Sequence, residues 1–328
     1  MNKKLNSNIY WAFFRFALVI AILYFLVSSD VLDIKKLIIM LKSGWIYIGF
    51  ICLLITLFFS MLRWKILLSS INLTLRMREI ASLTFIGFSL NKLIPGAIFG
   101  DIVKSYYLGR GSPNKVKIIM TIVLDRFIGI FTLIFTGALA ISGILIFRSD
   151  LLKTSEELHN IQVLGFTLFL IVAIIIFVFY FSLSNKFHQY NIIKGLTANM
   201  RTHKTFGKLF DIFNLLKYKK RFLLSATCIS IIGKIPLILC MYFIGKSTGE
   251  NDLLFAHYLF LAPVAYTLNA IPFGAGGLGT GEVFVYKLFK LFGSVNGANI
   301  IAIFHIATIF FSLIGLILYV FHKKQERI

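Results

Sequence analysis

Long apolar runs are the feature that most limits how this chain can fold. Each has about 17 to 25 residues, the length that an α-helix needs to cross the hydrocarbon core of a bilayer. Seven such runs are visible, at roughly 11–28, 45–62, 127–147, 163–183, 222–245, 253–271 and 298–321. Backbone polar groups in lipid must be satisfied within their own segment, so these runs are expected to be helices. The sequence therefore predicts an all-α polytopic membrane protein.

The charge of the chain fits this class better than it fits a nucleic-acid-binding protein. Hydrophobic residues make up 58% of the 328 residues and charged residues only 14%, with a formal net charge of +21. Such an excess of lysine and arginine would indicate nucleic acid as the partner of a soluble protein. Here the basic residues lie between the apolar runs, as they do in cytoplasmic loops. We therefore expect no nucleic-acid partner, whereas anionic lipid headgroups remain open as partners.

Two similar interruptions break the apolar pattern, one in each half of the chain. Residues 91–101 and 269–282 each contain an asparagine, then Ile-Pro, then glycines, then a carboxylate. Broken backbone at membrane depth is tolerated only inside protein or beside a water-filled cavity. Paired broken segments in the two halves of a membrane protein point to a transport site. We expect one integral membrane domain, residues 1–328, built as a pseudo-repeat with motifs at 91–104 and 269–282.

Loop charges predict the orientation. Residues 63–79 and the long loop 184–221 are rich in lysine and arginine, so both are expected in the cytoplasm, as is the N-terminus. Residues 148–162 and 246–252 are more acidic and are expected outside. The chain must then start and finish residues 63–126 on the cytoplasmic side. The first interruption should therefore dip into the membrane and return.

The second half allows two topologies. Seven spans would leave the C-terminus outside, but the basic tail 322–327 favours the cytoplasm. An eighth crossing by residues 272–292 would resolve this conflict, and we prefer it to a second re-entrant segment. The expected fold thus has about eight transmembrane helices with one or two re-entrant or broken Pro/Gly segments.

The first motif combines a backbone break with side-chain charge. Pro95 removes a backbone donor, and Gly100 allows close backbone approach. Asp101 and Lys104 are three residues apart and share a face if a helix begins near Gly100. Together with Asn91 they are candidate substrate-binding residues. The alternative is an ordinary helix start, at which an acidic residue complements the helix dipole.

The adjacent pair Asp125 and Arg126 lies at the entrance of the expected 127–147 span. Such a pair is often an anchor at the membrane surface. Alternatively, Arg126 pairs with Asp101 or binds a phosphate with two parallel hydrogen bonds. The sequence does not decide between these interpretations.

The second motif is rich in small residues. Its candidate binding residues are Asn269, Pro272, Gly276, Gly277, Gly279 and Glu282. Glycines that open a helix present N–H groups suited to a phosphate or carboxylate. The motif lacks the Gly-Lys-Ser/Thr ending of a nucleotide P-loop, so ATP is not expected there. Tight helix packing through small residues is the alternative, although a carboxylate at membrane depth favours a functional site.

Three further ionisable residues lie inside apolar runs. Lys234 is too far from the ends of the 222–245 run to reach water easily, so it is expected to face a cavity or pair with Glu282 or Asp101. His257 and His305 are interpreted as packing residues. The chain contains no hydrolase, zinc-helix or Asp-rich metal motif. We therefore predict no catalytic residues, no metal site and no cofactor.

Taken together, these motifs resemble the lysylphosphatidylglycerol synthase transmembrane family, also called the flippase-like domain family. The residues that carry the resemblance are Asn91, Pro95, Gly96, Gly100, Asp101, Lys104, Leu108, Asp125, Arg126, Gly129, Pro263, Pro272, Gly276, Gly277, Leu278, Gly279 and Glu282. The family usually has Gly-Gly-Asp followed by an arginine, whereas this chain has Phe99 before Gly100 and lysine at position 104. Because lysine lacks the guanidinium fork, the headgroup preference is expected to differ.

The resemblance implies a protein of the cell membrane, plasma or inner, that moves or presents an anionic phospholipid or a lipid-linked glycan intermediate. The soluble aminoacyl-transfer domain of the lipid-lysylating enzymes has no counterpart in these residues, so enzymatic activity is not expected. Two alternatives stay open. The chain is a membrane subunit of a lipid aminoacylation or glycosylation system, or it is a scaffold whose loop 184–221 binds a glycosyltransferase. Self-association is a further possibility.

Overall fold

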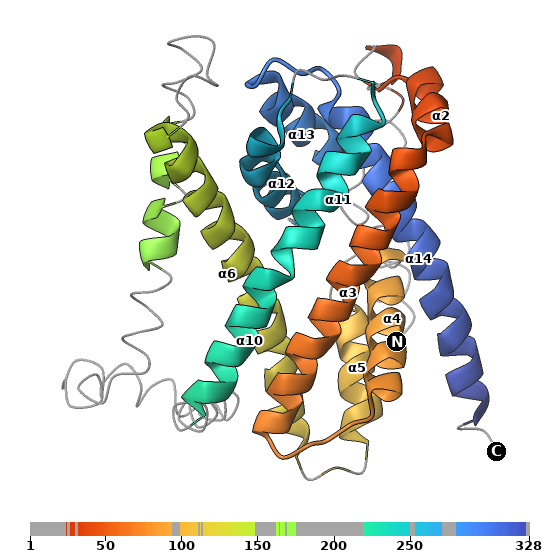
Figure 1. The fold of residues 1–328 in the computed structure, drawn as a ribbon. Coiled ribbons are helices and arrows are strands. Elements are labelled where there is room, and N and C mark those ends of the chain that lie inside the picture. The colour runs from red at the N-terminus through yellow and green to blue at the C-terminus, as the bar shows by residue number, and fades with distance from the viewer. Residues whose placement is uncertain are drawn as a thin grey trace, which may run out of the picture.

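The computed structural model is a bundle of helices (Figure 1). It describes residues 24, 27–29, 32–93, 99–110, 112, 114–147, 162–163, 165–167, 169–174, 219–249, 253–270 and 280–325. Every regular element named within these ranges is an α-helix, which confirms the predicted all-α class.

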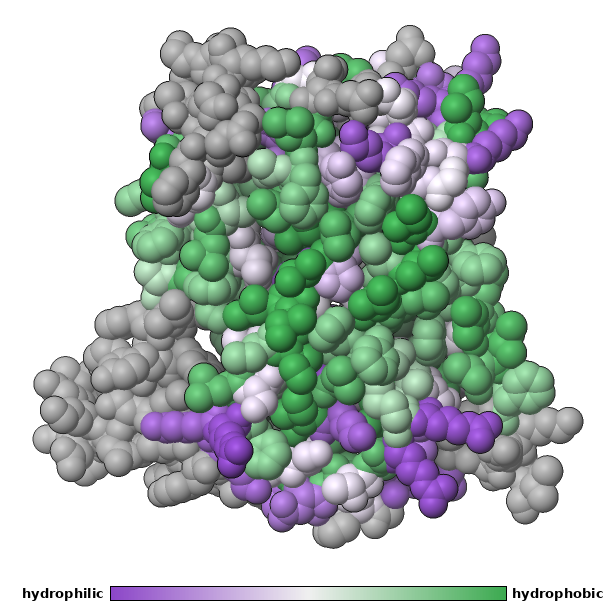
Figure 2. All heavy atoms as spheres, in the orientation of Figure 1, coloured by the Kyte–Doolittle hydropathy of each residue, from purple (hydrophilic) through white to green (hydrophobic). Residues whose placement is uncertain are grey.

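Within the part of the chain that the structure describes, four helical segments are long and apolar enough to cross a membrane. They are formed by α3 (Gly44–Ser70), α6 (Lys115–Phe147), α10 (Lys220–Ile232) together with α11 (Lys234–Lys246), and α14 (Gly297–Gln325). The 27 residues of α3 span about 40 Å at 1.5 Å per residue, more than a bilayer core of roughly 30 Å. In Figure 2 hydrophobic side chains form a broad band, and hydrophilic ones gather toward the two ends. These features are those of a multi-pass membrane protein.

A short break separates α10 from α11. Pro236 has no N–H with which to bond the carbonyl of Ile232, the last residue of α10. Gly233 lies at the break, where its N–H donates to Ile229 O at 2.9 Å. A Cβ on Gly233 would lie 2.8 Å from Phe59 Cβ, so the glycine also lets α3 pack closely. The two helices therefore continue as one membrane-length segment beside α3.

The first hairpin consists of α4 (Met77–Leu93) and α5 (Phe99–Gly109). The two backbones touch, because a Cβ on Gly100 would lie 1.9 Å from Gly87 O. Leu67 near the end of α3 and Met120 near the start of α6 belong to one buried cluster. The chain thus enters and leaves this hairpin at the same end of the bundle, the lower end in Figure 1. The chain thus returns to the end from which it came, as predicted for residues 63–126, whereas the cytoplasmic location of that end stays a prediction.

The second hairpin consists of α12 (Phe255–Ala270) and α13 (Thr280–Lys290), and it lies at the upper end of Figure 1. Rings near the start of α12 contact rings near the end of α13: Tyr258 and Phe289 have centroids 5.9 Å apart, and Phe260 and Phe292 5.8 Å. The two helices are therefore antiparallel, and the eighth crossing that we preferred for residues 272–292 is not confirmed. At 16 and 11 residues, these helices are about 24 and 16 Å long, too short to cross singly.

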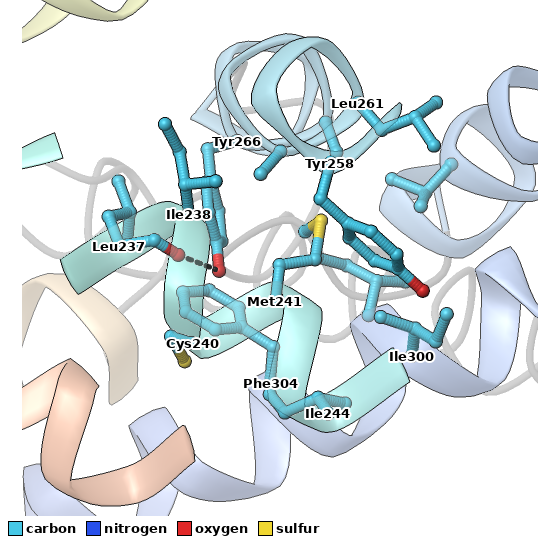
Figure 3. Packing of buried hydrophobic residues seen from close by; sticks show 14 of the residues in the cluster. Leu237, Ile238, Cys240, Met241, Ile244, Tyr258, Leu261, Tyr266, Ile300 and Phe304 are labelled. Carbon is cyan, nitrogen blue, oxygen red and sulfur yellow. Dashed lines mark hydrogen bonds between the residues drawn. The ribbon is translucent and has the colours of Figure 1, made fainter. Parts of the chain in front are cut away.

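Each hairpin packs on the long helix that follows the other hairpin. The first helix of each hairpin makes this contact, α4 with α14 and α12 with α6. The α4–α14 contact is tight, because a Cβ on Gly315 would lie 2.0 Å from Phe85 O. Apolar side chains of α11, α12 and α14 fill the core beside the second hairpin, where Tyr266 donates to Leu237 O at 3.3 Å (Figure 3). The two hairpins are thereby held against the same set of long helices.

The helix boundaries change one interpretation of the sequence. Because α6 begins at Lys115, Asp125 and Arg126 lie about ten residues inside a long helix rather than just before one, and their place at the entrance of a membrane span stays a prediction. Most of the runs 11–28 and 163–183 and residues 184–218 of the basic loop lie outside the described residues. Figure 1 places the C-terminal end of α14 at the lower end, where α3 ends and α10 begins.

Candidate functional site

An ion pair between the buried Arg63 and the partly buried Asp125 joins α3 to α6. Arg63 Nε donates to Asp125 Oδ1 at 2.6 Å, and Arg63 Nη2 donates to Asp125 Oδ2 at 3.1 Å. This paired geometry is the one in which a guanidinium binds a carboxylate most strongly. Arg63 lies seven residues before the end of α3 at Ser70, which is about 10 Å along the helix. The pair is therefore well inside the bundle.

Neighbouring side chains fix the guanidinium. Arg63 Nη1 donates to Ser230 Oγ at 2.9 Å, and the Ser230 and Thr132 hydroxyls are 2.7 Å apart. A Cβ on Gly129 would lie 3.2 Å from Arg63 Nη1, so the absent side chain leaves room for the guanidinium. Arg63 thus connects α3, α6 and α10.

A second ion pair joins the first motif to α6. Asp101 Oδ2 pairs with Arg126 Nε, as the sequence suggested. Asn91 Oδ1 accepts a hydrogen bond from the Gly100 N–H at 2.8 Å, and its Nδ2 lies 3.5 Å from Asp101 Oδ1. Asn91 therefore satisfies a free N–H at the start of α5, as a capping residue does, and also orients the motif carboxylate.

Two lysines complete this region. Lys104 Nζ lies 4.6 Å from the centroid of the Trp64 ring, within the distance for a cation–π interaction. The charges of Asp125, Asp101, Arg126 and Arg63 all act on it. Lys234 is 8% exposed, and the charges acting on it are those of Arg63 and Asp125 rather than the expected Asp101 or Glu282.

We call Arg63, Asp101, Lys104, Asp125, Arg126 and Lys234 the arginine cluster. It contains four cationic side chains and two carboxylates, a formal excess of two positive charges when all are ionised. Charges held away from water are costly unless they are compensated. An anion entering this region would compensate the excess, and phosphate is the group that arginine and lysine suit best.

The second motif forms a separate cluster. Glu282 Oε1 lies 2.8 Å from His305 Nδ1, and both residues are only 1% exposed. The charge of Lys92, near the end of α4, acts on both side chains. We call Lys92, Glu282 and His305 the histidine cluster. It brings together α4 of the first hairpin with α13 and α14.

The two motif carboxylates occupy corresponding positions. Asp101 is the third residue of α5 and Glu282 the third residue of α13, the helix that follows each break. Each pairs with a basic side chain of the next long helix, Arg126 on α6 and His305 on α14. The paired motifs of the sequence are thus matched by paired contacts.

The structure brings together six of the predicted site residues, Asn91, Gly100, Asp101, Lys104, Asp125 and Arg126, with Lys234 beside them. Glu282 lies in the histidine cluster. Pro95, Pro272, Gly276, Gly277 and Gly279 lie outside the described residues, and Asn269 is described only by its helical backbone in α12. The proposed phosphate cradle of glycine N–H groups therefore stays a prediction.

Three residues of the clusters were not among the predicted site residues. Arg63 was counted as a loop charge, although the apolar Leu67 and Leu68 that follow it indicate a longer helix. His305 was interpreted as a packing residue, but it contacts Glu282. His257 does have a structural role, since its Nδ1 accepts a hydrogen bond from the Leu254 N–H at 2.9 Å. Lys92 stood inside the first motif without an assigned role.

No group of three or more histidine, cysteine, aspartate or glutamate side chains suited to a metal ion occurs among the described residues.

Comparison with known proteins gives the family. The model of the lysylphosphatidylglycerol synthase transmembrane region matches residues 13–315. The chain belongs to this family. It is 25% identical over 257 residues to the UPF0104 membrane protein PH1989 of Pyrococcus horikoshii, an alignment that covers 70% of this chain and 72% of that protein. No solved structure matches the chain. Both matches are to membrane proteins, in agreement with the four membrane-length segments.

Proposed function

We propose that this member of the family moves an anionic lipid, a phospholipid or a lipid-linked glycan intermediate, across the cell membrane. The observation that carries the proposal is the arginine cluster, in which four cationic side chains and two carboxylates from the first hairpin and from helices of membrane length come together. Ionisable residues at membrane depth commonly mark the path of a substrate or ion. A lipid phosphate supplies the negative charge that this region lacks.

The cluster residues divide into two roles. Arg63 already donates to Asp125, Ser230 and Ser60, so it serves as a fixed positive charge. Lys104 and Arg126 are the residues proposed to hold the phosphate. The Arg126 side chain is 40% exposed while it pairs with Asp101, which makes it the more accessible of the two arginines. A lipid phosphate would replace Asp101 as the ion-pair partner of Arg126 when the substrate enters, and Asp101 would pair with Arg126 again when the substrate leaves.

The architecture supports transport through an inverted pseudo-repeat. The first half is proposed to be α3, α4, α5 and α6, and the second α10–α11, α12, α13 and α14. In this repeat α4 corresponds to α12, and α6 corresponds to α14. The contact of α4 with α14 therefore corresponds to the contact of α12 with α6, and both contacts are present. The hairpins enter from opposite ends of the bundle (Figure 1). Inverted repeats with broken helices are a common basis of alternating access.

The proposed orientation follows from loop charge. The lower end carries Lys219, Lys220 and Arg221 at the start of α10, and it is proposed to face the cytoplasm of the cell membrane. The C-terminal end of α14 would then be cytoplasmic as well. A partner glycosyltransferase or a second copy of the chain stays a prediction without a contact to argue from.

The test is movement of fluorescent phosphatidylglycerol in proteoliposomes, measured as the fraction accessible to an external quencher. Wild-type protein is expected to raise this movement above that in protein-free vesicles. Lys104→Gln removes one of the two excess charges, and we expect its rate to fall about tenfold or more, the effect of losing one charge-assisted hydrogen bond. Lys65→Gln is the matched control, because Lys65 is exposed on α3 close to the cluster.

Equal rates for Lys104→Gln and wild type would refute the assignment of the site. No movement by the wild-type protein would refute translocation. Saturable binding of the same lipid without movement would instead favour presentation of the lipid to another protein.

A further inference from the structure

The histidine cluster differs from the arginine cluster in one chemical respect. At corresponding positions, Asp101 pairs with an arginine and Glu282 with a histidine. Arginine stays charged at every physiological pH, whereas histidine gains and loses a proton near neutrality. Of the two corresponding contacts, only the one in the second half can therefore respond to a proton.

The charge balance of the cluster depends on that proton. With His305 neutral, the Lys92 cation and the Glu282 carboxylate balance each other. A proton on His305 leaves one uncompensated positive charge, and Lys92 repels it. At 1% exposure, neither Glu282 nor His305 has water to offset this charge. Proton uptake in this closed arrangement is therefore unfavourable, and it favours separation of Lys92 from His305.

Lys92 and His305 lie on different helices, so they separate when α4 moves away from α14. Lys92 is at the end of α4 in the first hairpin, and His305 is on α14. The two helices are in backbone contact further along, where Gly315 meets Phe85 O and Ser89 donates to Ser312 O. A change at the histidine cluster thus acts on the contact by which α14 holds the first hairpin.

Other titratable groups near the cluster have partners elsewhere. On α12 the Tyr266 ring packs at a tilt against Phe304, with centroids 4.7 Å apart, and its hydroxyl donates to Leu237 O. On α2 (Ile34–Lys42) the capping residue Asp33 accepts from the Lys36 N–H at 3.0 Å. Cys240 of α11 interacts with Tyr266, Lys234 of α11 is acted on by the charges of Arg63 and Asp125, and Lys104 of α5 lies over the Trp64 ring. Asp101 of α5 pairs with Arg126, and Arg63 of α3 pairs with Asp125. The charges that act on His305 are those of Lys92 and Glu282.

We propose that Lys92, Glu282 and His305 form a proton-binding site, and that a proton taken up there loosens α4 from α14 and so drives one step of the transport cycle. The proton is the ligand, His305 with Glu282 is its acceptor, and Lys92 is the group that converts protonation into movement. The link to transport rests on the proposed lipid translocation, whereas proton binding itself does not.

Proteoliposomes test the link to transport. The rate of phosphatidylglycerol movement by the wild type is expected to change several-fold between about pH 5 and pH 8. In His305→Gln this dependence should disappear. Asp101→Asn changes the carboxylate that corresponds to Glu282 and serves as the control; it should lower the rate while keeping the pH dependence. A wild-type rate independent of pH, or a pH dependence that survives in His305→Gln, would overturn the proposal.

Thermal unfolding in detergent tests proton binding without transport. The melting temperature of the wild type should fall more steeply on acidification than that of His305→Gln, because a proton on His305 enters beside Lys92. Lys92→Gln removes the repulsion, so its melting temperature should fall less steeply on acidification than that of the wild type. Identical profiles for wild type, His305→Gln and Lys92→Gln would overturn the proton site. If the wild type moves no lipid but the melting profiles of the three proteins differ, translocation is refuted and the proton site is still supported.

Discussion

The guanidinium of Arg63 donates to side chains on three helices, and this makes its removal the sharpest test at the residue scale. Arg63→Gln leaves the partly buried Asp125 without its paired partner, and losing hydrogen bonds to a charged group costs about 2 kcal/mol of unfolding free energy. We expect this loss in denaturant titrations of the protein in mixed micelles. Arg221→Gln, at an exposed position on α10, should change stability little.

A double-mutant cycle with Asp125→Asn separates the pair from general disruption. If the pair is coupled, the double variant should lose less stability than the sum of the two single variants. Additive losses would show that Arg63 and Asp125 contribute independently, contrary to the geometry.

The sequence was informative about which carboxylates matter at this scale, and less so about their partners. Asp101 and Glu282 were found because a carboxylate after a Pro/Gly break in an apolar run is costly and rare. Arg63 and His305 were not assigned to the site, because their roles depend on helices more than 20 positions away, Asp125 for one and Glu282 for the other. A hydropathy pattern contains no such information.

At the scale of elements, the close approach of α4 and α5 depends on a missing side chain. Gly100→Ala would place a Cβ 1.9 Å from the backbone oxygen of Gly87, and backbone cannot give way as a flexible side chain can. We expect a loss of about 2 kcal/mol or more in unfolding free energy from this overpacking. The same micelle titrations measure it.

Gly143→Ala is the matched control, because nothing lies within 4 Å of the corresponding Cβ on α6. Replacing a helical glycine by alanine should stabilise the protein by roughly 0.5–1 kcal/mol. Opposite signs for the two variants would support the close approach of α4 and α5. An unchanged free energy of unfolding in Gly100→Ala would contradict this close approach.

The sequence located the breaks between these elements but not their depth or direction. Pro95 and Pro272 mark where helices must stop, since proline removes a donor. The sequence left open whether residues 272–292 cross the membrane or re-enter it. Ring contacts show that α12 and α13 are antiparallel, and contacts between side chains far apart in sequence cannot be deduced from hydropathy.

At the scale of the whole molecule, helix α4 connects the histidine cluster with the arginine cluster. Two adjacent residues of α4 contact the two clusters. Asn91 contacts Gly100 and Asp101 beside the arginine cluster, and Lys92 is part of the histidine cluster. A movement of α4 away from α14 would therefore also disturb the contact of Asn91 with Gly100 and Asp101. The proposed proton site and the proposed phosphate site are in this way connected through a single helix.

Cysteine labelling tests whether each hairpin begins and ends on the same side of the membrane. Single cysteines at Thr74 and Asn114 mark the ends of the first hairpin, and cysteines at Leu254 and Val295 mark those of the second; all four positions are exposed. In a background without Cys52, Cys228 and Cys240, an impermeant maleimide added to sealed cells or inverted vesicles should label each pair from one side. The two pairs should be labelled from opposite sides, because the hairpins enter from opposite ends of the bundle (Figure 1). Labelling of Leu254→Cys and Val295→Cys from different sides would mean that residues 254–295 cross the membrane. It would also remove the inverted symmetry on which alternating access is proposed.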